Sequence, residues 1–188
     1  MERKKAKALI VVDVQNDFCP GGAFPVPKGD EVVPVIRHIL FLNQLMPSSE
    51  KLLVFLTQDW HPNDHCSFND FPEHCVRNTP GAELHPGLKK IYHYQQCFLI
   101  KKGRKKEEEA FSGFKGTYLY QILKHYKVKQ VFVCGLATDY CVKATALDAQ
   151  KLGFKTSVIL DACRGVAPGG IETALKEMQD EGIKFIEL

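Results

Sequence analysis

The hydrophobic residues of this chain gather in six short runs, separated by longer polar or amphipathic segments. Each run is rich in Val, Ile, Leu or Phe and lacks the alternation of a strand with one exposed face. Such runs are typical of strands buried on both faces, as in a parallel sheet. The six predicted strands are residues 8–13, 51–59, 97–102, 130–135, 156–161 and 185–188.

Between these runs, apolar residues recur at the spacing of helices that pack on one side. Gly153 and Gly182 stand where two of the helical patterns stop. The predicted helices are residues 32–45, 116–126, 139–152 and 171–181. This alternation predicts a three-layer α/β/α, Rossmann-like fold with a central, mostly parallel six-stranded sheet. We expect one domain over residues 1–188, with long polar loops at 60–86 and 103–116.

The composition narrows the class of protein. The chain has 188 residues, 45% of them hydrophobic and 25% charged, which suits a buried core and excludes wholesale disorder. A net charge of +3 is too small to favour nucleic acid or a membrane surface, and no apolar stretch is long enough to span a bilayer. Seven cysteines and no visible secretory signal predict a cytoplasmic protein with reduced thiols. The sequence leaves a homo-oligomer open.

Four of the predicted strands bring polar side chains to one edge of the sheet. Asp13, Asp59 and Lys102 end three strands, and Cys141 closes the turn after a fourth. Ligands of open α/β sheets bind outside the carboxyl ends of the strands. We therefore expect an acid, a second acid, an ammonium and a thiol to converge there.

Cys141 lies between a predicted strand and a predicted helix, where the helix dipole lowers the pKa of a thiol. Taken alone, it would more commonly be a buried core cysteine. With an acid and a lysine at the same edge, we favour a nucleophile, with Asp13 as its base and Lys102 as the cation that stabilises the thiolate. A carboxylate that caps a turn and a solvated lysine are the structural alternatives for these two residues.

The segment after the second strand contains candidate metal ligands. His61 is two positions after Asp59, which places both side chains on one side of an extended segment. With His74 they would form a set of one carboxylate and two imidazoles that suits zinc, iron or manganese. A surface loop with scattered histidines is equally consistent with the spacing. A closed structural zinc site that adds Cys66 and Cys75 ranks lower, because no C-x-x-C pair supports it.

The basic run 101–106 is expected to be a solvated loop, because three glutamates at 107–109 follow it and neutralise it. The chain contains neither G-x-x-x-x-G-K-[ST] nor a G-x-G-x-x-G that opens a helix. Dependence on a nucleotide is therefore unsupported by any phosphate-cradle motif.

Five stretches of the sequence match one known family in order and spacing. They are VVDVQNDF at 11–18, DWHP at 59–62, HCV at 74–76 with TPGAE at 79–83, FSGF at 111–114 and GLATDYC at 135–141. On these motifs the sequence resembles the nicotinamidases, within the isochorismatase-like cysteine hydrolases, over nearly the whole chain. The resemblance implies a hydrolase of linear amide bonds that converts nicotinamide to nicotinate and ammonia through a cysteine thioester and feeds NAD salvage.

The resemblance also implies roles for individual residues. The catalytic triad falls on Asp13, Lys102 and Cys141. The backbone N–H groups of Ala137 and Cys141 would hold the oxyanion, next to a cis peptide bond between Leu136 and Ala137. The small-molecule substrate would be an uncharged pyridine carboxamide.

The implied metal centre holds one divalent ion on Asp59, His61 and His74, with zinc expected and iron or manganese as alternatives. His65 aligns near a fourth ligand in only some relatives and is left out. The residues implied around the pyridine ring are Phe18, Phe71, Leu136 and Ala137, with Phe111 nearby.

Two other functions remain open at this stage. One is another isochorismatase-like amidase, of the carbamoyl-sarcosine or ureidoacrylate type, because these enzymes share the fold. The other is a non-catalytic module whose zinc is structural.

Overall fold

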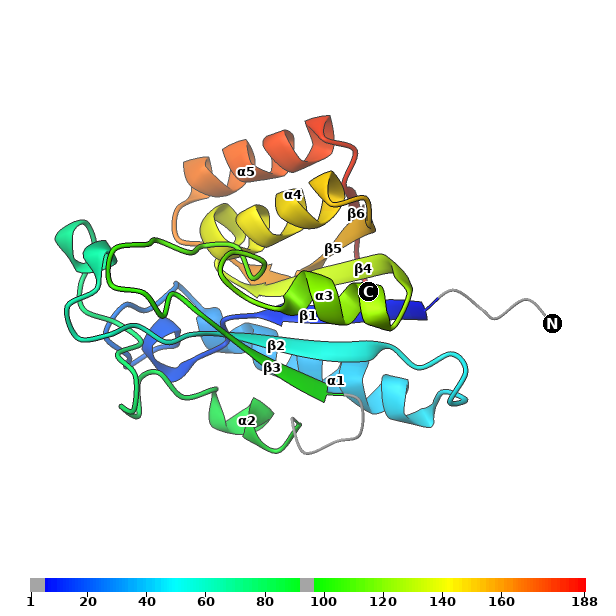
Figure 1. Cartoon of the computed structure of the whole chain (residues 1–188), viewed down its shortest axis with the longest axis horizontal. Coiled ribbons are helices and arrows are strands. Elements are labelled where there is room, and N and C mark those ends of the chain that lie inside the picture. The colour runs from blue at the N-terminus through cyan, green and yellow to red at the C-terminus, as the bar shows by residue number, and fades with distance from the viewer. Residues whose placement is uncertain (1–5, 92–96) are drawn as a thin grey trace.

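All six described strands run parallel in one sheet (Figure 1). The computed structural model describes residues 6–91 and 97–188, so residues 1–5 and 92–96 of the predicted domain lie outside the described residues. The strands are β1 (Ala6–Val12), β2 (Leu53–Asp59), β3 (Cys97–Lys102), β4 (Val128–Leu136), β5 (Lys155–Arg164) and β6 (Lys184–Ile186). Their order, β3-β2-β1-β4-β5-β6, is that of a Rossmann-like doubly wound sheet. The predicted fold class is confirmed, and the sheet is wholly rather than mostly parallel.

Helices cover both faces of the sheet. The short α2 (Pro86–Lys89) lies with α1 (Val32–Leu45) on one face, and α4 (Lys143–Lys151) lies with α5 (Pro168–Asp180) on the other (Figure 1). The remaining helix, α3 (Leu119–His125), contacts β4. Every residue of β2 is buried, as are the last five residues of β1. Burial on both faces explains why these strands carry continuous apolar runs instead of alternating patterns.

The observed helix boundaries differ from the predicted ones at three starts. A π-helical turn, Thr138–Val142, precedes α4. The predicted helix at 116 begins three residues later, at Leu119, whose N–H donates to the Thr117 hydroxyl at 3.2 Å. The predicted helix at 171 begins three residues earlier, at Pro168, whose missing N–H suits a first turn. The single turn α2 was not predicted.

The centre of the sheet holds the topological switch point. There β1 and β4 pair side by side, while the chain leaves them toward opposite faces. Asp13 directly follows β1, and the turn that carries Cys141 follows β4. Gly135 permits this close pairing, because it has a φ of +117° and a Cβ there would overlap the backbone of Val12. None of the described helices is long and apolar enough to cross a membrane.

Candidate active site and metal centre

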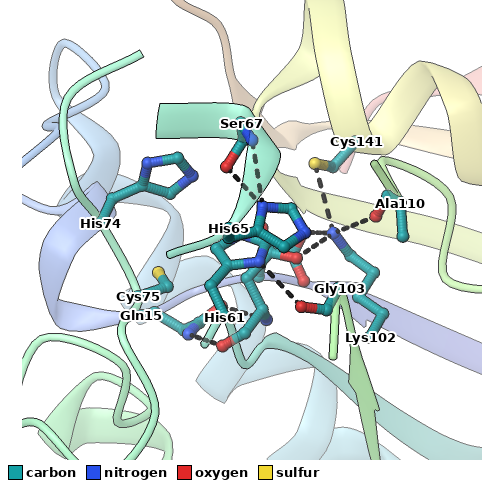
Figure 2. A network of polar contacts seen from close by, with 12 residues as sticks. Gln15, His61, His65, Ser67, His74, Cys75, Lys102, Gly103, Ala110 and Cys141 are labelled. Atoms are coloured by element: carbon teal, nitrogen blue, oxygen red, sulfur yellow. Dashed lines mark hydrogen bonds and ion pairs between the residues drawn. The ribbon is translucent and has the colours of Figure 1, made fainter. Parts of the chain in front are cut away.

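The ammonium of Lys102 lies at the centre of the predicted cluster and is buried (Figure 2). Its Nζ is 2.9 Å from a carboxylate oxygen of Asp13 and 2.6 Å from one of Asp59. It also donates to the Ala110 carbonyl at 2.9 Å and lies 3.5 Å from Sγ of Cys141. Burial alone would lower the pKa of this lysine, but the two carboxylates raise it well above its usual value. Lys102 is therefore a permanent buried cation, and the alternative of a solvated lysine is wrong.

Asp13 faces the thiol with one carboxylate oxygen free of hydrogen-bond donors. Oδ1 accepts a hydrogen bond of 2.6 Å from the Thr57 hydroxyl, whereas the buried Oδ2 accepts none within the described residues. Oδ2 is held only by the ion pair with Lys102. Burial raises the pKa of Asp13, and the charge of Lys102 only partly opposes this. The geometry suits a carboxylate that takes up and releases a proton.

The thiol of Cys141 does not have the low pKa expected from its place near a helix N-terminus. Sγ lies within 4.8 Å of a carboxylate oxygen of Asp13 and of one of Asp59. Burial raises the pKa of Cys141 well above its ordinary value, and Lys102 opposes this only in part. Desolvation is thus the main influence on this thiol, the nearby carboxylates act in the same direction, and the protonated form is favoured.

The three predicted metal ligands come together at the neighbouring position. One ligand atom from each of Asp59, His61 and His74 lies within 4.8 Å of the others, and all three residues are buried. Nδ1 of His61 is 3.0 Å from the carbonyl of Gly103, and Nδ1 of His74 is 2.6 Å from that of Pro72. Carbonyl acceptors at Nδ1 place the proton there and leave each Nε2 as a lone-pair donor. The donor set fits a divalent metal ion.

The surroundings shift the pKa values of the two imidazoles in opposite directions. Burial lowers the pKa of His74, which favours the neutral ring that a metal requires. For His61, burial also acts downward, but the Asp59 carboxylate outweighs it and raises the pKa. Nε2 of His61 is 3.7 Å from Oδ2 of Asp59, so a proton and a metal ion would compete for the same place.

A second group of ligand-type side chains, Asp13, Asp59 and Cys141, surrounds the Lys102 ammonium. This place already holds a cation, so it is an unfavourable position for a metal ion. Neither Cys66 nor Cys75 joins a ligand cluster within the described residues. The rival closed zinc site is therefore not formed.

His65 is buried and stacks on His61 with ring centroids 4.0 Å apart. Its Nδ1 lies 2.7 Å from the Ser67 hydroxyl, and its Nε2 lies 3.2 Å from the Glu108 carbonyl. Both ring nitrogens thus have partners within the protein. His65 supports the ring of His61 from behind and is not placed as a ligand.

Three residues that position the cluster were missed at the sequence level. Thr57 holds Asp13, as described above. The buried amide of Gln15 accepts from the Asp59 N–H at 2.8 Å and donates to the Asp59 carbonyl at 2.9 Å. Gly103 has a φ of +61°, and a Cβ there would lie 2.6 Å from Nδ1 of His61. Gln15 stands within a quoted motif and Gly103 directly follows Lys102, but only their long-range contacts show what they do.

An apolar, aromatic pocket opens over the thiol. It is lined by the predicted residues Phe18, Phe71, Leu136, Ala137 and Phe111, and also by Phe24, Val26, Tyr140, Val166 and Glu109. Two of the three candidate metal ligands, Asp59 and His74, line the same pocket as Cys141. The ring of Phe24, which was not predicted, lies 5.5 Å from Phe71 and 5.3 Å from His74. The peptide bond between Leu136 and Ala137 is cis, as expected.

A doubly wound sheet with this cluster at its switch point defines a hydrolase of the isochorismatase-like class. The model of the isochorismatase domain matches residues 7–188, and the chain belongs to the isochorismatase family. It is 37% identical to the nicotinamidase of Escherichia coli over 209 aligned positions, which cover 97% of this chain and 95% of that protein.

Two solved structures show the same similarity in three dimensions. The crystal structure of the pyrazinamidase of Pyrococcus horikoshii in complex with zinc is 44% identical, with a TM-score of 0.88 and coverage of 97% of this chain and 99% of that one. The yeast nicotinamidase bound to the inhibitor nicotinaldehyde is 29% identical, also with a TM-score of 0.88. The alignment covers 97% of this chain and 100% of that one.

Substitution of Gly103 by Ala tests the metal centre without changing a ligand. The new Cβ would push the His61 ring out of place, so affinity for zinc should fall by about tenfold or more in a competition titration with a chromogenic chelator. Gly116→Ala is the matched control, because Gly116 has a similar φ of +67° but open space around its Cβ. Equal zinc affinity in the two variants would show that His61 is not a ligand.

Proposed function

We propose that this protein hydrolyses nicotinamide to nicotinate and ammonia through a thioester on Cys141. The observation that supports this proposal most directly is that a buried thiol, a buried acid and a buried lysine meet beside an aromatic pocket. Two of the candidate metal ligands, Asp59 and His74, line the same pocket. An uncharged aromatic amide suits this environment, because its ring contacts apolar walls while its carboxamide reaches the thiol. The relatives named nicotinamidase support the same substrate.

The substrate ring would lie between Phe18 and Phe71, with Leu136 and Ala137 beside it. Asp59, His61 and His74 would hold one divalent ion, for which zinc is the first choice because of the zinc-bound pyrazinamidase. When bound, such an ion supplies a Lewis-acidic position for the pyridine nitrogen. Ring contacts and this anchor together would orient the carboxamide over Sγ.

In the first half of the reaction, in which Cys141 is acylated, Asp13 would act as the base. Its carboxylate takes the thiol proton, and Sγ forms a bond to the carboxamide carbon. Lys102 keeps the net charge of the pair low, because its ammonium contacts both the carboxylate and the sulfur. The backbone N–H groups of Ala137 and Cys141 would donate to the oxyanion, a contribution worth about 3 kcal/mol per donor in other hydrolases.

Asp13 would then return its proton to the carboxamide nitrogen as the C–N bond breaks, which releases ammonia and leaves the thioester. A water molecule would attack the thioester carbon while Asp13 takes its proton. The C–S bond breaks, the sulfur regains a proton, and nicotinate leaves. Nicotinate formed in this way would supply pyridine nucleotide synthesis, the role in NAD salvage that we propose for the protein.

Removal of the nucleophile is the direct test. We expect Cys141→Ala to lower ammonia release from nicotinamide by at least about 1,000-fold, because Cys141 is the only thiol among the described residues that line the pocket. Zinc content should stay at the wild-type level, since Cys141 is not among the proposed ligands. Cys97→Ala is the control for loss of a thiol, because Cys97 begins an edge strand at the far end of β3. Substantial activity of Cys141→Ala would refute the mechanism.

Removal of the metal separates substrate binding from chemistry. After dialysis against a chelator, KM for nicotinamide should rise much more than kcat falls, and added zinc should restore it. The measurement is a steady-state ammonia assay at several metal loadings. An unchanged KM in metal-free protein would exclude an anchoring role for Asp59, His61 and His74.

A further inference from the structure

A second cleft lies behind the active site, with a volume of about 540 Å³. Its walls come from four parts of the chain. They are Trp60 after β2, Arg77 in the loop that follows, positions between 101 and 110 at the end of β3 and in its loop, and positions 115 and 116 before α3. The lining residues are Trp60, Arg77, Lys101, Gly103, Arg104, Lys105, Glu108, Ala110, Lys115 and Gly116. The fold thus assembles this cleft, and the basic run 101–106 supplies only part of it.

The cleft concentrates positive charge. Five of its lining residues are cationic and one is a carboxylate, an excess of four charges, whereas the whole chain has an excess of only three. Lys105 pairs with that carboxylate, Glu108, at 2.8 Å. Within residues 6–91 and 97–188, the other four cations, Arg77, Lys101, Arg104 and Lys115, form no ion pair with a carboxylate.

The expectation of a neutralised, solvated loop is confirmed for the exposed residues 104–107, but not for Lys101 and Lys102. Of the three following glutamates, Glu108 pairs with Lys105, and Lys106 instead pairs with Asp64 at 3.0 Å. The Lys101 ammonium lies 3.3 Å from the centroid of the Trp60 ring. Lys101 is thus held against an apolar wall of the cleft rather than extended into solvent. Lys101 and Arg104 repel each other, and an anion bound in this cleft of net positive charge would relieve that repulsion.

We propose that this cleft is a binding site for an oligophosphate that carries three or four negative charges. Guanidinium and ammonium groups on several walls can each donate to phosphate oxygens, and two arginines add the planar geometry that phosphate favours. A single phosphate would balance only part of this charge, whereas a chain of two or three phosphates carries enough charge to match the excess of four.

The oligophosphate site shares backbone with the active site but not its pocket. Trp60 stands between the two candidate ligands Asp59 and His61, and the carbonyl of Gly103 accepts from Nδ1 of His61. The carbonyl of Ala110, another lining residue, accepts from Lys102. Binding in the second cleft would depend on its basic walls and not on the proposed amide hydrolysis.

Trp60 provides a direct readout, because it is the only tryptophan in the chain. We expect its fluorescence to change on titration of the metal-loaded protein with inorganic triphosphate, which does not absorb in the same range. The dissociation constant should be at least about tenfold lower than that for inorganic phosphate at equal ionic strength. A parallel calorimetric titration with adenosine triphosphate distinguishes the source, since tighter binding would identify a nucleotide and equal binding the phosphate chain alone.

Charge-reversed variants decide whether the cleft is the site. Arg104→Glu with Lys115→Glu should weaken triphosphate binding by at least about tenfold. The control, Lys151→Glu with Lys176→Glu, changes the total charge equally at exposed positions on α4 and α5 and should bind as the wild type does. Equal weakening in both pairs, or a response reproduced by sodium chloride at matched ionic strength, would overturn the proposal.

Because triphosphate also binds divalent ions, the titration is repeated with His74→Ala, which lacks one candidate metal ligand. The Trp60 response should persist in this variant even if ammonia release is lost. A response that disappears with His74 would show that triphosphate acts on the metal, and would overturn the second site without bearing on the proposed hydrolysis.

Discussion

The buried ammonium of Lys102 is the interaction on which the rest of the site depends. A charged group inside a protein carries a large desolvation cost, which only close partners of opposite charge and good hydrogen bonds offset. Here Asp13, Asp59 and the Ala110 carbonyl provide them. In turn, two carboxylates buried this close together would repel each other without the lysine between them. One cation therefore allows two acids, the proposed base Asp13 and the proposed metal ligand Asp59, to coexist beside the thiol.

The convergence of these groups could be predicted from the sequence, because it follows from where strands end. Asp59 and Lys102 are register partners on adjacent strands, and β1 and β4 deliver Asp13 and the Cys141 turn to the switch point between them. The alternation of side chains along β3 also explains why Lys101 and Lys102 differ so sharply. Lys102 points into the cluster, whereas its neighbour lies over Trp60.

Properties set by the surroundings rather than by position could not be predicted in this way. The pKa of Cys141 depends on how completely the thiol is desolvated, and burial reversed the direction expected from the helix dipole. The roles of Thr57, Gln15 and Gly103 rest on contacts with residues more than 40 positions away. The pairing of the basic run was also hidden, because Lys106 pairs with Asp64 from another loop instead of with an adjacent glutamate. Each of these properties is set by residues that are close in the folded protein but distant in the sequence.

The backbone segments that hold the cluster on one side form the basic cleft on the other. Lys102 and Gly103 therefore separate the apolar, aromatic pocket from the basic cleft. Whether Lys102 governs the thiol is tested most directly by the rate of Cys141 alkylation by iodoacetamide against pH, quantified on the Cys141 peptide. In a folded Lys102→Met variant, we expect the pKa of the Cys141 thiol to lie above that of the wild type, because the ammonium favours the thiolate. An unchanged or lower pKa in the variant would contradict it.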